Sequence, residues 1–211
     1  MGRLPVVIAL LVVASCNDPV KPGSGGRSEQ VAASGTTASA STTATASTAS
    51  HEVAAPKGPV CDTSVAGRAY PKTEADFVDA AGDVTSKTMP PFTGRARWLS
   101  FFASWCGPCK EEMPRVRSFA GRLGADLELV SIDDDLRQLT AFFGQQPAGG
   151  LKSSYWLKDG PIRTAWLASL KMKSDPPLPE HAIFDGKGRL RCFVSGAVED
   201  GDYAQIVAAL Q

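Results

Sequence analysis

The chain has 211 residues, 22 Lys and Arg balance 22 Asp and Glu, and 43% of the side chains are hydrophobic. This length allows one ordinary domain with appendages, because single domains usually span about 100 to 200 residues. The formal net charge of zero argues against a general nucleic-acid binder, which needs a basic surface to hold phosphates. The five Cys are too few for a small disulfide-stapled scaffold, and their odd number needs an explanation.

Residues 1–15 have the pattern of an export signal. Arg3 places a positive charge near the N-terminus, and an apolar run from Leu4 to Val13 follows it. The run is shorter than the roughly 20 apolar residues that cross a bilayer. The sequence Val13-Ala14-Ser15-Cys16 resembles a bacterial lipobox, which implies that the signal is removed and that Cys16 is lipidated. An ordinary secretion signal that contains a Cys, or a buried strand at the start of the chain, are the alternatives.

Residues 16–56 are predicted to form a lipid-anchored, disordered tether. Within 31–50, eighteen of twenty residues are Ala, Ser or Thr, with no charged or aromatic side chain among them. Such a segment has nothing to bury that would offset the entropy of ordering it. The predicted folded domain is therefore 57–211.

Strand and helix patterns alternate along this domain. A Thr73/Asp76 cap pattern with Gly82 as a stop predicts a short helix at Thr73–Ala81. The other expected elements are a strand at 97–103, a helix from 106 to a stop at Gly124, a strand at 127–132, a helix from about 136, a strand at 154–157, a helix at 161–170, a hairpin of 182–185 and 189–194, and a last helix capped by Asp202. This order predicts an α/β sandwich.

Three adjacent carboxylates, Asp133 to Asp135, follow the strand predicted at 127–132. A metal site is one interpretation. The favoured interpretation is a cap for the next helix, because the N-terminus of a helix favours negative charge.

The segment Trp105-Cys106-Gly107-Pro108-Cys109 carries the chemistry. Cys106 falls between a buried strand and a helix, where free backbone N–H groups and the helix dipole lower the pKa of a thiol from about 8.5 to roughly 7 or below. Cys106 is therefore the expected attacking sulfur, and Cys109, one turn on, the resolving one. Gly107 and Pro108 keep the turn tight. Trp105 is expected to shield the pair and shape a docking surface, or simply to pack.

Two other interpretations of the Cys pair are a half zinc site and an inert structural pair. A zinc site would need a second pair of ligands, and the remaining Cys and His are not adjacent to one another in the sequence. We expect no metal and no cofactor.

The segment Phe101 to Pro114 resembles the active-site segment of the TlpA/ResA-like thiol:disulfide oxidoreductases of the thioredoxin superfamily. Residues 178–188 resemble that family's cis-proline loop and the hairpin that follows. The resemblance, which covers about residues 95–211, implies a three-layer thioredoxin-like sandwich with a central mixed sheet and a C-terminal β-hairpin plus helix. It also implies that Pro179 is cis and packs against the Cys pair, with the Leu178 backbone pairing with an incoming peptide.

The sequence departs from the family at two positions. Glu180 follows Pro179 where Thr is common, and Ser100 stands where thioredoxin has a buried acid that relays protons to the second Cys. We hypothesise that Glu180 is the substitute proton acceptor; a solvated loop carboxylate is the alternative. One interpretation of His181 is a third copper ligand beside the two Cys, as in Sco-like chaperones. Its position in the strand does not match the position of the histidine in those proteins, so we favour an ordinary strand residue.

Cys61 and Cys192 are the remaining pair, and we hypothesise that they form a structural disulfide. Two independent buried thiols are the alternative.

These features together predict an envelope thiol:disulfide oxidoreductase, anchored by Cys16 and facing the periplasm or the exterior, with a lean towards reduction. The expected partners are protein thiol or disulfide substrates and a membrane electron donor, with no nucleic acid, and the protein is expected to be a monomer. The alternative is a tethered thioredoxin-fold binding module that holds a metal or docks a partner without turnover.

Overall fold

The computed structural model describes residues 58–72 and 74–211. The predicted export signal, Cys16 and the tether at 16–56 lie outside the described residues.

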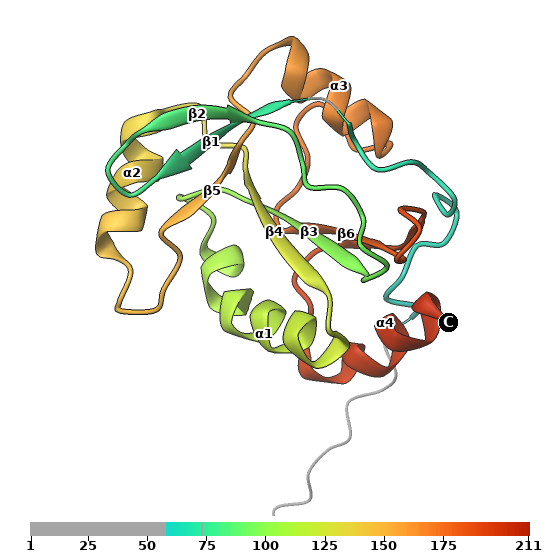
Figure 1. The fold of residues 1–211 in the computed structure, drawn as a ribbon. Helices are drawn as coiled ribbons and strands as arrows, with labels where there is room; N and C mark the ends of the chain where they lie inside the picture. The colour runs from blue at the N-terminus through green and yellow to red at the C-terminus, as the bar shows by residue number, and fades with distance from the viewer. Residues whose placement is uncertain (1–57, 73) are drawn as a thin grey trace, which may run out of the picture. The chain divides into compact units, whose positions relative to one another are not determined.

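A seven-stranded mixed sheet organises the domain, with strand order β2-β1-β5-β4-β3-β6-β7 (Figure 1). The strands are β1 (Ala75–Asp79), β2 (Val84–Lys87), β3 (Arg97–Phe102), β4 (Asp126–Ser131), β5 (Ser153–Trp156), β6 (Glu180–Phe184) and β7 (Leu190–Ser195). β3, β4 and β5 are parallel, and β6, β7, β1 and β2 extend the sheet by antiparallel pairing on its two sides. β3 is an interior strand between β4 and β6 with all six residues buried, as its nearly continuous apolar run predicts.

Helices cover both faces of this sheet. They are α1 (Gly107–Leu123), α2 (Leu136–Gln145), α3 (Pro161–Ser169) and α4 (Tyr203–Leu210), with a short 3-10 turn η1 (Asp200–Asp202) before α4. The right-handed crossovers from β3 to β4 to β5 place α1 and α2 on one face, and α3 lies on the opposite face (Figure 1). α4 joins the first layer, where Tyr203 packs edge-on against Phe119 of α1 with ring centroids 5.0 Å apart. The predicted three-layer sandwich with its closing hairpin and helix is confirmed.

The helix predicted at Thr73–Ala81 is wrong. The described residues of this segment form β1, which pairs with β2 and β5, and Phe77 packs edge-on against Tyr155 of β5. Gly82, interpreted as a helix stop, has a φ of 87° and turns the chain into β2. Asp79 stabilises that turn by accepting from the N–H groups of Ala81 and Asp83. Pairing with two strands outweighs a weak local helix signal.

The other predicted elements are confirmed within a few residues, and α1 ends at Gly124 in the left-handed conformation. The cap predicted for the acidic triplet holds for one residue only. The Asp135 carboxylate accepts from the N–H of Arg137 at the start of α2, whereas Asp134 pairs with Arg163 of α3. Asp202 is the N-cap residue of α4, as predicted, but its carboxylate accepts from the N–H of Glu199 in the capping box of η1 and from no N–H of α4.

A disulfide joins Cys61 to Cys192 across 131 positions of sequence. Cys192 is fully buried in β7, and Cys61 packs against the same hydrophobic cluster. Next to the bridge, the N–H of Asp62 donates to the carbonyl of Phe193 at 2.8 Å. The bond thus fastens the segment that precedes β1 to the edge strand β7.

Candidate functional site

The Cys pair lies at the start of α1, where β3 ends. Cys106 is the N-cap residue, and Cys109, one turn later, is bonded to it by a disulfide. The N–H of Cys109 donates to Cys106 Sγ at 3.2 Å. Pro108 lies in the first turn of α1, where a backbone N–H would have no acceptor within the helix, so the missing N–H of proline costs nothing there. A sulfur in this position receives backbone donors and the positive end of the helix dipole, both of which stabilise a thiolate when the bond is reduced.

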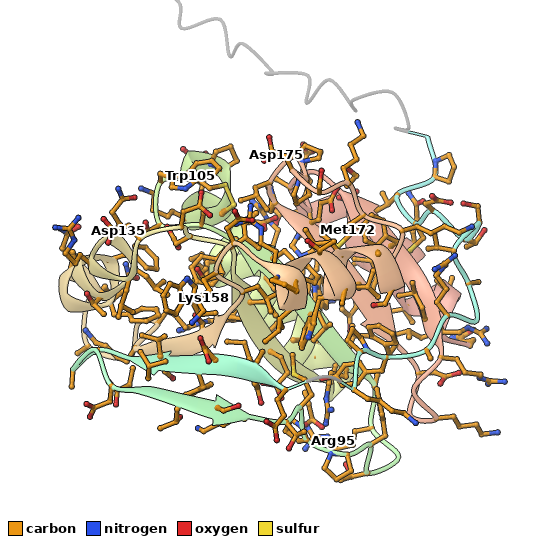
Figure 2. The ribbon with its side chains drawn as sticks, turned by 90° about the horizontal axis from the view of Figure 1, so that it is seen from above. Arg95, Trp105, Asp135, Lys158, Met172 and Asp175 are labelled. Carbon is orange, nitrogen blue, oxygen red and sulfur yellow. A yellow bond between two sulfur atoms is a disulfide. The ribbon has the colours of Figure 1, made fainter. Side chains whose placement is uncertain are left out.

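A buried carboxylate fixes the loop that leads into Cys106. Both oxygens of Asp133 accept from the Ser104 N–H, at 3.0 and 2.9 Å, and the Ser104 hydroxyl donates to Oδ1 at 2.6 Å. The Ser131 hydroxyl adds a bond to Oδ2 at 2.7 Å. The next residue, Trp105, is 63% exposed, and Figure 2 shows it at the end of the domain opposite Arg95. The hydrogen bonds of Asp133 thus hold the corner from which Trp105 projects.

The loop before β6 carries the proline that the family resemblance singles out. The Leu178–Pro179 peptide bond is cis, and the carbonyl of Pro179 accepts from the N–H of Gly196 at 2.9 Å. Leu178 is partly buried and packs against the hydrophobic cluster that contains Phe101 and Trp166. Contact of Pro179 with the sulfurs stays a prediction.

A second buried carboxylate, Glu112, lies one helical turn beyond Cys109 and is 2% exposed. Its Oε2 accepts from the N–H of Val198 at 2.8 Å, and its Oε1 lies 3.2 Å from Nε2 of His181. His181 accepts at Nδ1 from the indole N–H of Trp98 at 3.1 Å. A neutral His181 therefore carries its proton on Nε2, facing Glu112. The favoured interpretation of His181 as a strand residue holds, and the structure adds this polar pairing.

Glu180 is also buried, with 5% exposure. Burial raises the pKa of its carboxyl to about 7, although the Ser195 hydroxyl and the charge of Lys173 act in the other direction. The hydroxyl donates to Oε1 at 3.3 Å, and Oε2 has no hydrogen-bond partner among the described residues. The solvated-carboxylate alternative is therefore excluded.

The strand register separates the two buried glutamates. His181 lies opposite Ser100 in the β6–β3 pair, and its side chain meets Glu112 of α1. Side chains alternate along a strand, so Glu180, the preceding residue, points to the opposite face of the sheet. Glu112 and not Glu180 shares the face of Ser100, where the relay acid of thioredoxin would stand.

Sequence reasoning missed Asp133 and Glu112 as site residues. Asp133 was grouped with its two neighbours as a cap, although it directly follows the buried end of a strand. Glu112 lies on the buried stripe of α1, together with Cys109, Met113 and Val116. An acid on the apolar side of a predicted helix was the signal that could have found it.

Two features that would indicate other functions are absent from the described residues. No group of three or more His, Cys, Asp or Glu side chains in this part of the chain is arranged to hold a metal ion. No described helix is both long enough and apolar enough to cross a membrane.

The sequence matches the Redoxin family model over residues 33–202. Among curated proteins, it is 37% identical over 62 residues to a thioredoxin of Bacillus subtilis, covering 29% of this chain and 58% of that protein. It is 35% identical over 69 residues to a thioredoxin of Mycobacterium tuberculosis, covering 33% of this chain and 52% of that one. The chain thus spans about half the length of the curated relatives that it matches.

Solved structures share the fold. A DsbF homologue from Corynebacterium diphtheriae superposes with a TM-score of 0.51 and 19% identity, covering 74% of this chain and 96% of that one. The thioredoxin domain of a thiol-disulfide oxidoreductase from Bacteroides vulgatus gives 0.50 and 17%, covering 69% and 98%. These likenesses support the thioredoxin-like fold.

Proposed function

Because the chain belongs to the Redoxin family, we propose that it exchanges disulfides with protein substrates through Cys106 and Cys109. The observation that carries the proposal is the Cys106–Cys109 disulfide at the N-terminus of α1, with the N–H of Cys109 directed at Cys106 Sγ. A helix N-terminus favours the thiolate, and the thiolate is the form that attacks a disulfide.

In the reducing direction the reaction has two steps. The Cys106 thiolate attacks one sulfur of the client disulfide, which forms a mixed disulfide and releases the other client sulfur as a thiolate. Cys109, once deprotonated, attacks Cys106 Sγ, which closes the Cys106–Cys109 bond and releases the second client thiol. The pair loses two electrons to the client, and a membrane electron donor returns them. The Gly107–Pro108 pair between the cysteines supports this direction by its resemblance to reducing thioredoxins.

The proposed location is the bacterial cell envelope, with the domain held by a lipid on Cys16. The lipobox-like sequence and the Ala, Ser and Thr-rich segment that follows support it. Expression with a labelled fatty acid tests the anchor: the label should enter the parent protein and be absent from Cys16→Ala. A labelled Cys16→Ala protein would contradict the assignment.

Insulin reduction with dithiothreitol tests the activity. The parent should accelerate the precipitation of insulin chains, and Cys106→Ser should not. An inactive parent would favour a binding module without turnover.

A further inference from the structure

A groove runs along α1, and its lining includes Lys110, the residue that follows Cys109. It has a volume of about 350 Å³, within the range of ligand-binding pockets. One wall comes from α1, and the other from Phe142 of α2 and the loop 146–151. Figure 1 shows that loop beside the N-terminal half of α1. Arg117 Nη1 donates to the carbonyl of Gly149 at 2.9 Å, which joins the two walls.

The α1 wall continues the helical stripe that begins at the attacking sulfur. Lys110, Met113 and Arg117 follow Cys106 at intervals of four, three and four residues, so they share one face of the helix. At 1.5 Å per residue, Met113 lies about 10 Å and Arg117 about 16 Å along the axis from Cys106. An extended peptide advances about 3.3 Å per residue. A client bonded to Cys106 would therefore reach these positions about three and five residues from its own cysteine.

The groove combines an apolar floor with a cationic rim. Met113, Phe142 and Leu151 are mostly buried and form the floor. Lys110 and Arg117 form the rim, and among the described residues no Asp or Glu lines the groove or pairs with either cation. The single bond of Arg117 to Gly149 leaves further guanidinium N–H groups to donate. The rim is thus complementary to a carboxylate.

We propose that this groove binds an acidic polypeptide segment of the client, next to the disulfide under attack. An apolar side chain about three residues from the client cysteine packs on the floor, and a carboxylate about five residues away meets Arg117. The proposal rests on the proposed disulfide exchange, and it names the class of client that the exchange favours.

The test uses matched disulfide peptides and the pre-reduced protein. Each peptide carries Leu at the third residue from its cysteine and either Glu or Gln at the fifth. In one Glu/Gln pair these residues precede the cysteine, and in the other pair they follow it. The pre-reduced parent should reduce the Glu member of one pair about five times faster than its Gln partner, measured as the second-order rate constant of this single turnover. High salt should diminish the preference.

Variants locate the effect. Arg117→Gln should bring the rate for the Glu peptide to within twofold of the rate for the Gln peptide. Arg117→Lys, which keeps the charge, should retain most of the preference. Lys187→Gln, which removes a cation from the β6–β7 turn, should behave like the parent.

The outcomes distinguish a failure of the groove proposal from a failure of the proposed disulfide exchange. Equal rates for Glu and Gln peptides in the parent, with both reduced, would overturn the groove and leave the disulfide exchange standing. A preference that survives Arg117→Gln would also overturn it. Failure to reduce either peptide would overturn the proposed function and this inference with it.

Discussion

The Asp133 carboxylate binds both the backbone and the side chain of Ser104. The Ser104 hydroxyl lies 2.6 Å from Oδ1, and the Ser104 N–H lies within 3.0 Å of both oxygens. The carboxylate is fully buried, and it connects the end of β4 to the loop that carries Trp105 and Cys106. The corner before the redox pair is thus fixed from a neighbouring strand.

Replacing Asp133 by Asn should loosen this corner. The amide has one acceptor oxygen where three donor groups converge, and buried hydrogen bonds to a charged group each contribute about 1.5 to 3 kcal/mol. We expect urea unfolding to show a loss of about 2 kcal/mol, and insulin reduction to slow several-fold. Asp135→Asn is the matched control, because Asn caps a helix as well as Asp does. An Asp133→Asn protein as stable and as active as Asp135→Asn would refute the role.

Glu180 should make stability depend on pH. Its pKa rises from 4.5 to about 7 on folding because of burial, so the folded state holds a proton that the unfolded state has released between these values. The contribution of Glu180 to the free energy of unfolding therefore falls as pH rises from about 4.5 through 7. The stability of Glu180→Gln relative to the parent should be greater at pH 8 than at pH 5 in urea titrations. The same difference at both pH values would contradict the shift.

We predict that Glu112, which lies on the same face of the sheet as Ser100, accepts the Cys109 proton. The measurement is the rate at which Cys109 resolves a mixed disulfide on Cys106, followed against pH. At pH values below the pKa of the Cys109 thiol, Glu112→Gln should slow this step about a hundredfold, the lower end of general-base effects. Glu180→Gln should leave the profile unchanged. A profile that changes only in Glu180→Gln would contradict this role of Glu112 and support the hypothesis for Glu180.

The Cys61–Cys192 bond should stabilise the domain without taking part in the exchange. Closing a loop of this length contributes about 4 to 5 kcal/mol by the chain-entropy estimate. The double variant Cys61→Ala, Cys192→Ala should lose up to that amount in urea unfolding and, at a temperature where it stays folded, keep its insulin reductase activity. Unchanged stability would argue against the brace, and lost activity in the folded variant would argue for a second redox role.

The sequence predicted the central strand, α1 and the closing hairpin because burial and helical period are local signals there. It failed at β1, since the pairing with β2 and β5 depends on residues that are distant in the sequence. The same limit applies to the site. Cys106 and Cys109 stand in one motif, whereas the roles of Asp133 and Glu112 depend on Ser104 and His181, which other strands and loops bring to them.

Trapping of the mixed disulfide tests the central claim most directly. Reduced Cys109→Ala and Cys106→Ala proteins are incubated with one disulfide peptide, and their intact masses are measured under denaturing, non-reducing conditions. Cys109→Ala should gain the mass of one peptide chain on Cys106, and Cys106→Ala should remain essentially unmodified. An adduct on Cys109 that forms as fast as the one on Cys106, or no adduct on either protein, would contradict it.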